Sequence, residues 1–186
     1  MKERLPLLPE DRMNDAQKQA TAALIAGPRK AVFGPFIPLM RSPELLDRLQ
    51  RVGEYLRFQS AVPAKLGEFA TLVVARHCSN QFEWAMHHPL AIKAGVARAT
   101  VDALEARVRP GAMAGDEAVV YDFVAQLLAT HRVSDADYAR ALTLLGEQGV
   151  VDLVAIVGYF GLVNAIMNVA GTPPPANGVP ALPEVL

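Results

Sequence analysis

The longest apolar stretch of the chain, Val150 to Ala170, most restricts how the chain can fold. It is long enough to cross a lipid bilayer as a helix. However, it contains Asp152, Asn164 and Asn168, and its flanks lack the aromatic and basic residues that anchor membrane spans. We therefore expect a helix that is buried on nearly all sides, at the centre of a protein or between subunits, and no association with a membrane.

The rest of the chain predicts further helices, because apolar residues recur at helical spacing and glycine or proline separates the runs. No run alternates convincingly between apolar and polar residues, as a strand would. The expected helices run from Asn14 to about Ile25, from Ser42 to about Phe58, from Pro63 to a turn near Asn80, from there to Gly95, over about 98–107 and 116–131, from Ser134 to Gly146, and over the apolar stretch. Residues 29–41 are too rich in proline for a long helix. The sequence predicts a single all-α domain.

Composition limits the partners and the cellular location that we expect for this domain. Of 186 residues, 52% are hydrophobic and only 20% are charged, so the excess apolar surface predicts a subunit interface. The net charge of −1 and the scattered basic residues indicate no nucleic-acid partner. The single cysteine, Cys78, cannot form an intrachain disulfide, which fits a reducing cytoplasm. The charged start of the chain does not resemble a signal peptide.

Acidic and imidazole side chains gather in one otherwise apolar part of the sequence. Glu83 and His87 are four residues apart, which places them on one face of a helix. Glu68 lies on the preceding helix, and an antiparallel return of the chain would bring it to the same place. Two carboxylates and an imidazole between two helices suit proton transfer, so we expect these three to be catalytic. The alternative is an ordinary Glu–His pair on a solvated helix face.

Other polar and aromatic residues are candidates for contact with a substrate: Asn80, Trp84, Tyr159 and Asn168. For each, a packing role is the alternative, because amides bond to neighbouring helices and aromatic rings fill cores. His77, His87 and His88 do not have the spacing of metal ligands, so no metal site is predicted.

A longer pattern resembles a known family. Its parts are Gly34-Pro35-Phe36, Arg41–Leu45, Leu49–Phe58, Glu68, Ala75-Arg76, Gln81–Trp84 and His87. Together they resemble the carboxymuconolactone decarboxylase family, which includes alkylhydroperoxidase D. The resemblance divides the chain into an N-terminal helical extension (1–33), the family-like domain (34–170) and a proline-rich tail (171–186). The tail is expected to be an extended arm or loosely ordered.

The resemblance implies an all-helical fold that assembles into a homo-trimer or homo-hexamer. The peroxidase members carry a Glu, a Cys-x-x-Cys pair and a His. Glu68 and His87 match the Glu and the His, but Asn80 and Glu83 stand at the two cysteine positions. Reduction of peroxide through an internal disulfide is therefore excluded.

The decarboxylase members imply a cofactor-independent lyase that acts on a small carboxylated lactone from the degradation of aromatic compounds. In this reading His87 donates a proton, and Glu83 or Glu68 orients its ring. A doubly negative substrate would also need a nearby Arg, for which Arg57 and Arg76 are the closest candidates. The alternatives are a thiol-dependent peroxidase that uses Cys78 and a non-catalytic oligomeric binder of small molecules.

Overall fold

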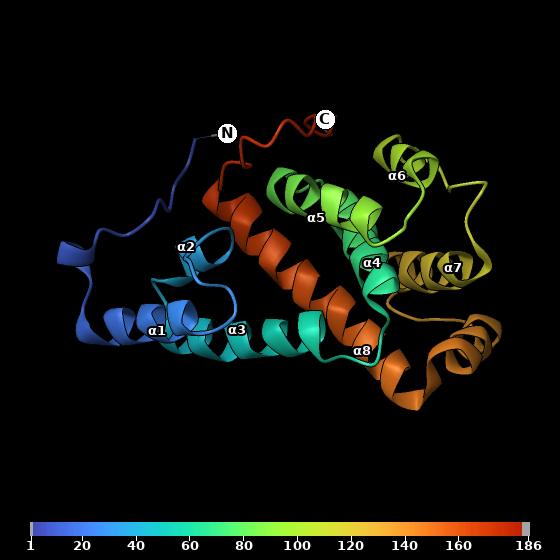
Figure 1. Cartoon of the computed structure of the whole chain (residues 1–186), viewed down its shortest axis with the longest axis horizontal. Coiled ribbons are helices and arrows are strands. Elements are labelled where there is room, and N and C mark those ends of the chain that lie inside the picture. Colours follow the sequence, from blue (N-terminus) through green and yellow to red (C-terminus); the bar gives the residue numbers. More distant parts are fainter. Residues whose placement is uncertain (1, 184–186) are drawn as a thin grey trace.

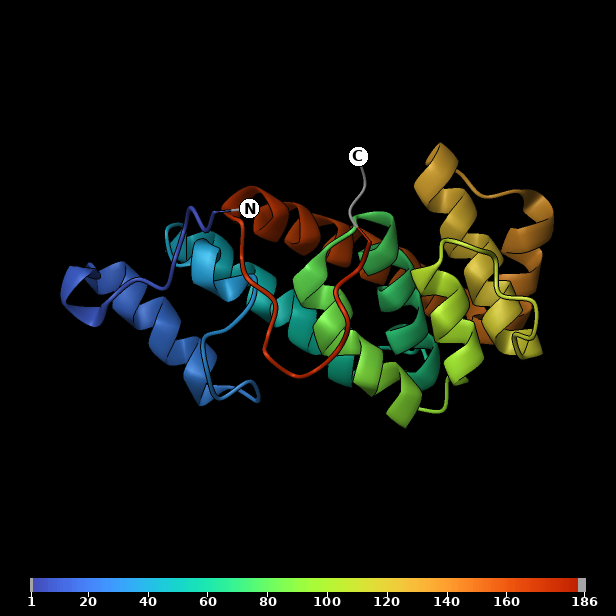
Figure 2. The ribbon, with the colours of Figure 1, turned by 90° about the horizontal axis from the view of Figure 1, so that it is seen from above.

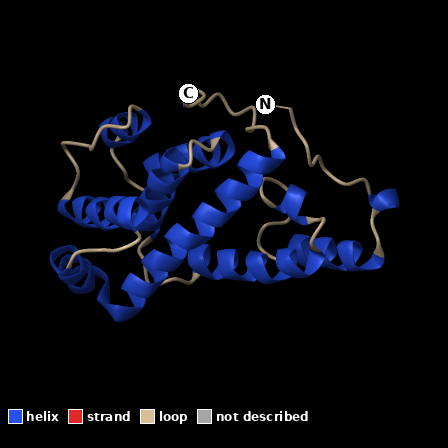
Figure 3. Ribbon diagram, turned by 180° about the vertical axis from the view of Figure 1, so that it is seen from behind, coloured by secondary structure: helices blue, strands red, loops and turns tan. Residues whose placement is uncertain are grey.

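The computed structural model describes residues 2–183, and every regular element within this range is a helix (Figure 3), as predicted. The elements are η1 (Glu10–Arg12), α1 (Asp15–Ala26), α2 (Phe36–Leu39), α3 (Pro43–Phe58), α4 (Ala64–His77), α5 (Gln81–Lys93), α6 (Arg98–Glu105), α7 (Gly115–Thr130) and α8 (Asp135–Ala170).

The helix α8 runs diagonally through the molecule and organises the other helices around it (Figure 1). α3 packs on one side of α8, and α4 and α7 pack on the other. Leu153, Ile156, Phe160 and Val163 recur at three- and four-residue spacing and are buried in the main core. α8 is apolar and long enough to span a membrane, and more than half of its most apolar part is buried within the fold. The sequence predicted burial on nearly all sides, but Val151 and Val169 leave one face of the helix exposed in the single chain.

Gly146 bends α8 where the sequence predicts a helix end. Its backbone is non-helical, with φ 68° and ψ 176°, a conformation that glycine adopts without steric cost. The two helices expected before and after this residue are therefore the two arms of one kinked helix. The first arm begins at Ser134, whose hydroxyl accepts a hydrogen bond from the Asp137 amide at 3.2 Å.

The proline-rich stretch 29–41, expected to be irregular, contains the single helical turn α2. Phe36 is 1% exposed and packs with Leu24 and Leu46 in a second, smaller core beneath α1 and α3. Burial of these side chains fixes a turn that the local sequence does not favour. This small core joins the N-terminal segment to the rest of the fold.

The proline-rich tail lies against α5 of its own chain over residues 171–183 (Figure 2). Pro89 has no N–H, so the carbonyl of Ala85 lacks its helical partner, and the Asn177 side chain donates to that carbonyl at 2.8 Å. The Leu182 amide also donates to Gln81 Oε1 at 2.7 Å. The described part of the tail is thus docked in place rather than free, and residues 184–186 lie outside the described range.

Asp152 connects α8 to the end of α3. Its carboxylate is 5% exposed and accepts hydrogen bonds from the Tyr55 hydroxyl at 3.1 Å and from the Ala61 amide at 2.8 Å. A buried acid in an apolar helix is costly unless its oxygens are hydrogen-bonded, and here they are. This contact holds the loop between α3 and α4 against α8.

Replacing Asp152 with Ala should lower the free energy of unfolding by roughly 2–3 kcal/mol, because two shielded donors lose their acceptor. Asp152→Asn retains one carbonyl acceptor and should cost less. Urea denaturation measures both, with Glu147→Ala, an exposed acid on the same helix, as the control. Equal stability of Asp152→Ala and the control would contradict this role of Asp152.

Candidate active site

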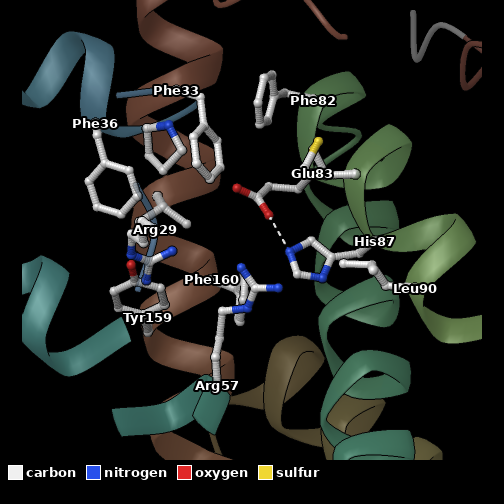
Figure 4. A pocket seen from close by; sticks show the side chains of 13 residues that line it. Arg29, Phe33, Phe36, Arg57, Phe82, Glu83, His87, Leu90, Tyr159 and Phe160 are labelled. Carbon is white, nitrogen blue, oxygen red and sulfur yellow. Dashed lines mark ion pairs between the residues drawn. The ribbon is translucent and has the colours of Figure 1, made fainter. Parts of the chain in front are cut away.

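The ring of His87 lies between two carboxylates that come from different helices. Its Nδ1 atom is 2.6 Å from Glu68 Oε2, and its Nε2 atom is 3.0 Å from Glu83 Oε2. His87 is 5% exposed and Glu83 is 4% exposed, so both groups are shielded from bulk water. Figure 4 shows the Glu83–His87 pair at the wall of a pocket.

Local sequence and helix packing together produce this arrangement. Glu83 lies in the first turn of α5 and His87 one turn later, so both project from one face. The Asn80 side chain caps α5 by accepting a hydrogen bond from the Glu83 amide at 2.8 Å. α4 packs against α5 and brings Glu68 to the other ring nitrogen. The structure therefore brings together all three residues predicted to be catalytic.

The two carboxylates keep His87 protonated at neutral pH. Burial by itself lowers the pKa of the ring, but the hydrogen bonds and charges of Glu68 and Glu83 outweigh burial and raise the pKa from 6.5 to about 9. Both ring nitrogens then carry a proton, one directed to each carboxylate. His87 is thus poised as a proton donor.

Two further side chains complete the surroundings of the imidazole. Arg57 Nη2 lies 3.9 Å from Glu68 Oε1, whereas the other carboxylate oxygen of Glu68 contacts His87. Phe160 of α8 presents an edge-to-face contact, with its ring centroid 5.2 Å from that of His87. An aromatic ring at this place excludes water from the imidazole and strengthens the charge interactions there.

His87, Arg57 and Phe160 separate two small hollows. The Glu83-side hollow is lined also by Glu83 and has a volume of about 30 Å³. The Glu68-side hollow is lined also by Glu68 and has a volume of about 40 Å³. Each admits only molecules of about the size of water as it stands, so a larger ligand must displace part of the wall.

The wall of the Glu83-side hollow is apolar except for a few charged or hydroxyl groups (Figure 4). Its lining residues are Arg29, Phe33, Pro35, Phe36, Arg57, Phe82, Glu83, Met86, His87, Leu90, Tyr159, Phe160 and Val163. Arg29 was not singled out from the sequence. It lies between Pro28 and Lys30, and no local spacing links it to the cluster around His87.

Tyr159 lines the Glu83-side hollow, and burial raises the pKa of its hydroxyl. Asn80, Trp84 and Asn168 line neither hollow. Asn80 Nδ2 donates to Asn168 Oδ1 at 2.8 Å, and Asn168 Nδ2 donates to the carbonyl of Cys78 at 2.9 Å. Trp84 is 1% exposed within the main core. Asn80 and Asn168 therefore join helices and Trp84 fills the core, which are the packing roles named as alternatives for these residues.

Cys78, His77 and His88 also lie outside both hollows. Burial raises the pKa of the Cys78 thiol, which disfavours the reactive thiolate. His88 packs against Trp84, with the two ring centroids 5.8 Å apart. Within residues 2–183, no three His, Cys, Asp or Glu side chains form a group that could hold a metal ion.

The pKa of His87 predicts how stability depends on pH. A group whose pKa rises on folding stabilises the fold fully below its unfolded pKa, and this contribution is lost as pH rises through the folded pKa. We expect the free energy of unfolding to fall by about 3 kcal/mol between pH 6.5 and 9. His87→Gln should lack this decrease in urea titrations. The same slope in both proteins would show that His87 is not the group responsible.

Comparisons with known proteins agree with the fold. Residues 43–125 match the model of the carboxymuconolactone decarboxylase family. A structure described as the alkylhydroperoxidase AhpD core of an uncharacterised peroxidase-related protein from Ralstonia eutropha JMP134 covers 93% of this chain and 92% of its own. It has a TM-score of 0.74 and 18% identity. The structure of a second uncharacterised peroxidase-related protein, from Silicibacter sp. TM1040, covers 95% of this chain and 94% of its own, with a TM-score of 0.69 and 17% identity.

No curated protein matches the chain. The matched region contains Glu68, Glu83 and His87. The two solved structures share the helical fold over nearly the whole length of the chain. Residues 43–125 therefore resemble the carboxymuconolactone decarboxylase family, and the chain has an alkylhydroperoxidase D-like fold that lacks the Cys-x-x-Cys pair.

Proposed function

We propose that this protein is a cofactor-independent acid–base enzyme, a lyase that acts on a small carboxylated lactone derived from an aromatic compound. The observation that carries the proposal is the His87 imidazole, buried with a carboxylate at each nitrogen. A protonated ring that is held in a fixed orientation can deliver a proton to a developing carbanion. The family supports the choice of a decarboxylation.

The proposed reaction needs only groups that the chain supplies. The bond between carbon and the departing carboxylate breaks, CO₂ leaves, and the electron pair delocalises onto the unsaturated lactone carbonyl. His87 then donates the Nε2 proton to carbon, which neutralises the charge left by the departing CO₂, and any second carboxylate of the substrate stays on the product. Because Nε2 faces Glu83 in this structure, the substrate has to replace Glu83 at that nitrogen. The other ring proton stays on Nδ1, which continues to donate to Glu68, and this hydrogen bond holds the ring in its orientation.

The charges around the hollow favour a negatively charged substrate. Among the residues that line the two hollows, Glu68 and Glu83 supply two negative charges, whereas His87, Arg57 and Arg29 supply three positive charges, which leaves +1. From the sequence, two glutamates beside the site would repel a dianion. The two arginines and the imidazolium remove this objection, since they exceed the acids in number.

A thiol-dependent peroxidase is the weaker alternative, because Cys78 lines neither hollow and burial raises the pKa of its thiol. A non-catalytic binder would keep the same hollow without turnover. The distinction between an enzyme and a binder therefore depends on whether His87 supports a reaction.

We further propose that the protein works in the cytoplasm as a homo-oligomer, in threes or sixes. One face of α8 leaves Val151 66% exposed and Val169 65% exposed, with Val154 and Leu162 between them at 43% and 42%. A second copy of this chain would remove this apolar surface from water. Light scattering coupled to size-exclusion chromatography measures the subunit number.

His87→Gln, Glu68→Gln and Glu83→Gln should each lower turnover of carboxymuconolactone-type lactones by at least about 10²-fold, because each removes the donor or a group that orients it. His88→Gln is the matched control, since it changes the adjacent buried histidine outside both hollows. Cys78→Ser should also retain activity. Full activity of His87→Gln would refute the proposed role, and loss of peroxide consumption only in Cys78→Ser would favour the peroxidase.

A further inference from the structure

Arg29 occupies the Glu83-side hollow from a part of the chain that lies before the matched family region. It lies between α1 and α2, in the segment that also contributes Phe33 to the same wall. Figure 4 shows its guanidinium across the hollow from His87, beside the ring of Tyr159. Arg29 and His87 are therefore placed to contact two ends of one small ligand.

The guanidinium of Arg29 has donors without acceptors. Its Nε and Nη2 atoms are buried, and neither has a hydrogen-bond partner within the described residues. Other shielded arginines are paired: Arg41 donates to the carbonyl of Pro6, Arg76 to that of Glu105, and Arg57 lies near Glu68. Unpaired buried donors are rare because water is lost without replacement, so an unpaired guanidinium in a hollow indicates a missing anion.

The surroundings hold this guanidinium in place without supplying an acceptor to its Nε and Nη2 atoms. Its carbon lies 4.5 Å from the centroid of Phe36, a cation–π contact that fixes position but supplies no hydrogen-bond acceptor. Gly53 of α3 gives it room, since a Cβ there would overlap both Arg29 Nη2 and the Tyr159 hydroxyl. Burial lowers the pKa of the guanidinium, which shows that its charge is poorly solvated.

We propose that Arg29 binds a carboxylate of a small, flat, unsaturated substrate in the Glu83-side hollow, so that the N-terminal segment determines substrate specificity. Arg109 shows the geometry available to such a pair, because its Nε and Nη2 atoms hold both oxygens of Asp122 at 2.8–3.1 Å. Phe33, Phe82 and Phe160 supply apolar walls that suit a flat compound. The inference rests on the proposed function for the identity of the substrate, but anion binding can be tested without turnover.

The probe is crotonate, a small planar carboxylate, with crotonamide as its uncharged isostere. Arg29→Gln should weaken crotonate binding at least about tenfold, the effect of a lost charge-assisted hydrogen bond, and should leave crotonamide within twofold. Arg29→Lys keeps the charge but not the planar pair of donors, so its affinity should be intermediate. Arg48→Gln, which changes an exposed arginine paired with Glu44, is the matched control. Isothermal titration calorimetry measures each affinity.

Equal crotonate affinity in Arg29→Gln and the wild type would overturn the proposal, as would equal binding of crotonate and crotonamide by the wild type. If Arg29→Gln does not fold, the proposal is tested by NMR on the wild-type protein. The ¹⁵N chemical shift of Arg29 Nε should change when crotonate is added and should stay the same when crotonamide is added. An unmoved signal would also overturn it. Turnover that survives His87→Gln, together with lost crotonate binding in Arg29→Gln, would refute the proposed function and leave the anion site intact.

Discussion

The charge interaction between Glu68, His87 and Glu83 is the constraint on which the rest of this structure depends. Removing one ion from water costs several kcal/mol, so the buried Glu83 and His87 and the partly buried Glu68 are tolerated only when each finds its partners. Two of them come from α5 and one from α4, so these helices cannot slide past each other without separating the charges. The same contacts that hold the helices in register also keep a proton on the imidazole at neutral pH.

The central helix α8 converts this charge cluster into an enclosed site. Consecutive positions serve different purposes: Phe160 covers the ring of His87, and Tyr159 lines the Glu83-side hollow. Their rings meet edge to face, with centroids 5.4 Å apart, so each restrains the other. Asp152, two turns earlier, holds the loop that follows α3 and thereby steadies the helix that carries Arg57. Packing of one apolar helix thus fixes the shape of both hollows.

The N-terminal segment adds a wall and a charge that the matched family region does not contain. The small core around Phe36 joins this segment to α3, and Arg29 then reaches the Glu83-side hollow. Its positive charge shifts the balance of the site from neutral to net positive. Under the proposed function, the acids around His87 remain ionised while the site attracts an anionic substrate, so substrate selection and proton donation share one small space.

The sequence alone determined what depends on neighbours along the chain. It predicted the helices, with starts at Asn14 and Ser134, and the pairing of Glu83 with His87, because helical geometry places such residues at known separations. Its placement of Glu68 needed only the return of the next helix. Tertiary structure alone decided whether a polar side chain meets a ligand or another helix, because a pattern cannot reveal a partner that is distant in sequence. That is why Asn80 turned out to bond to α8, whereas Arg29, with no local signal, reached the hollow beside His87.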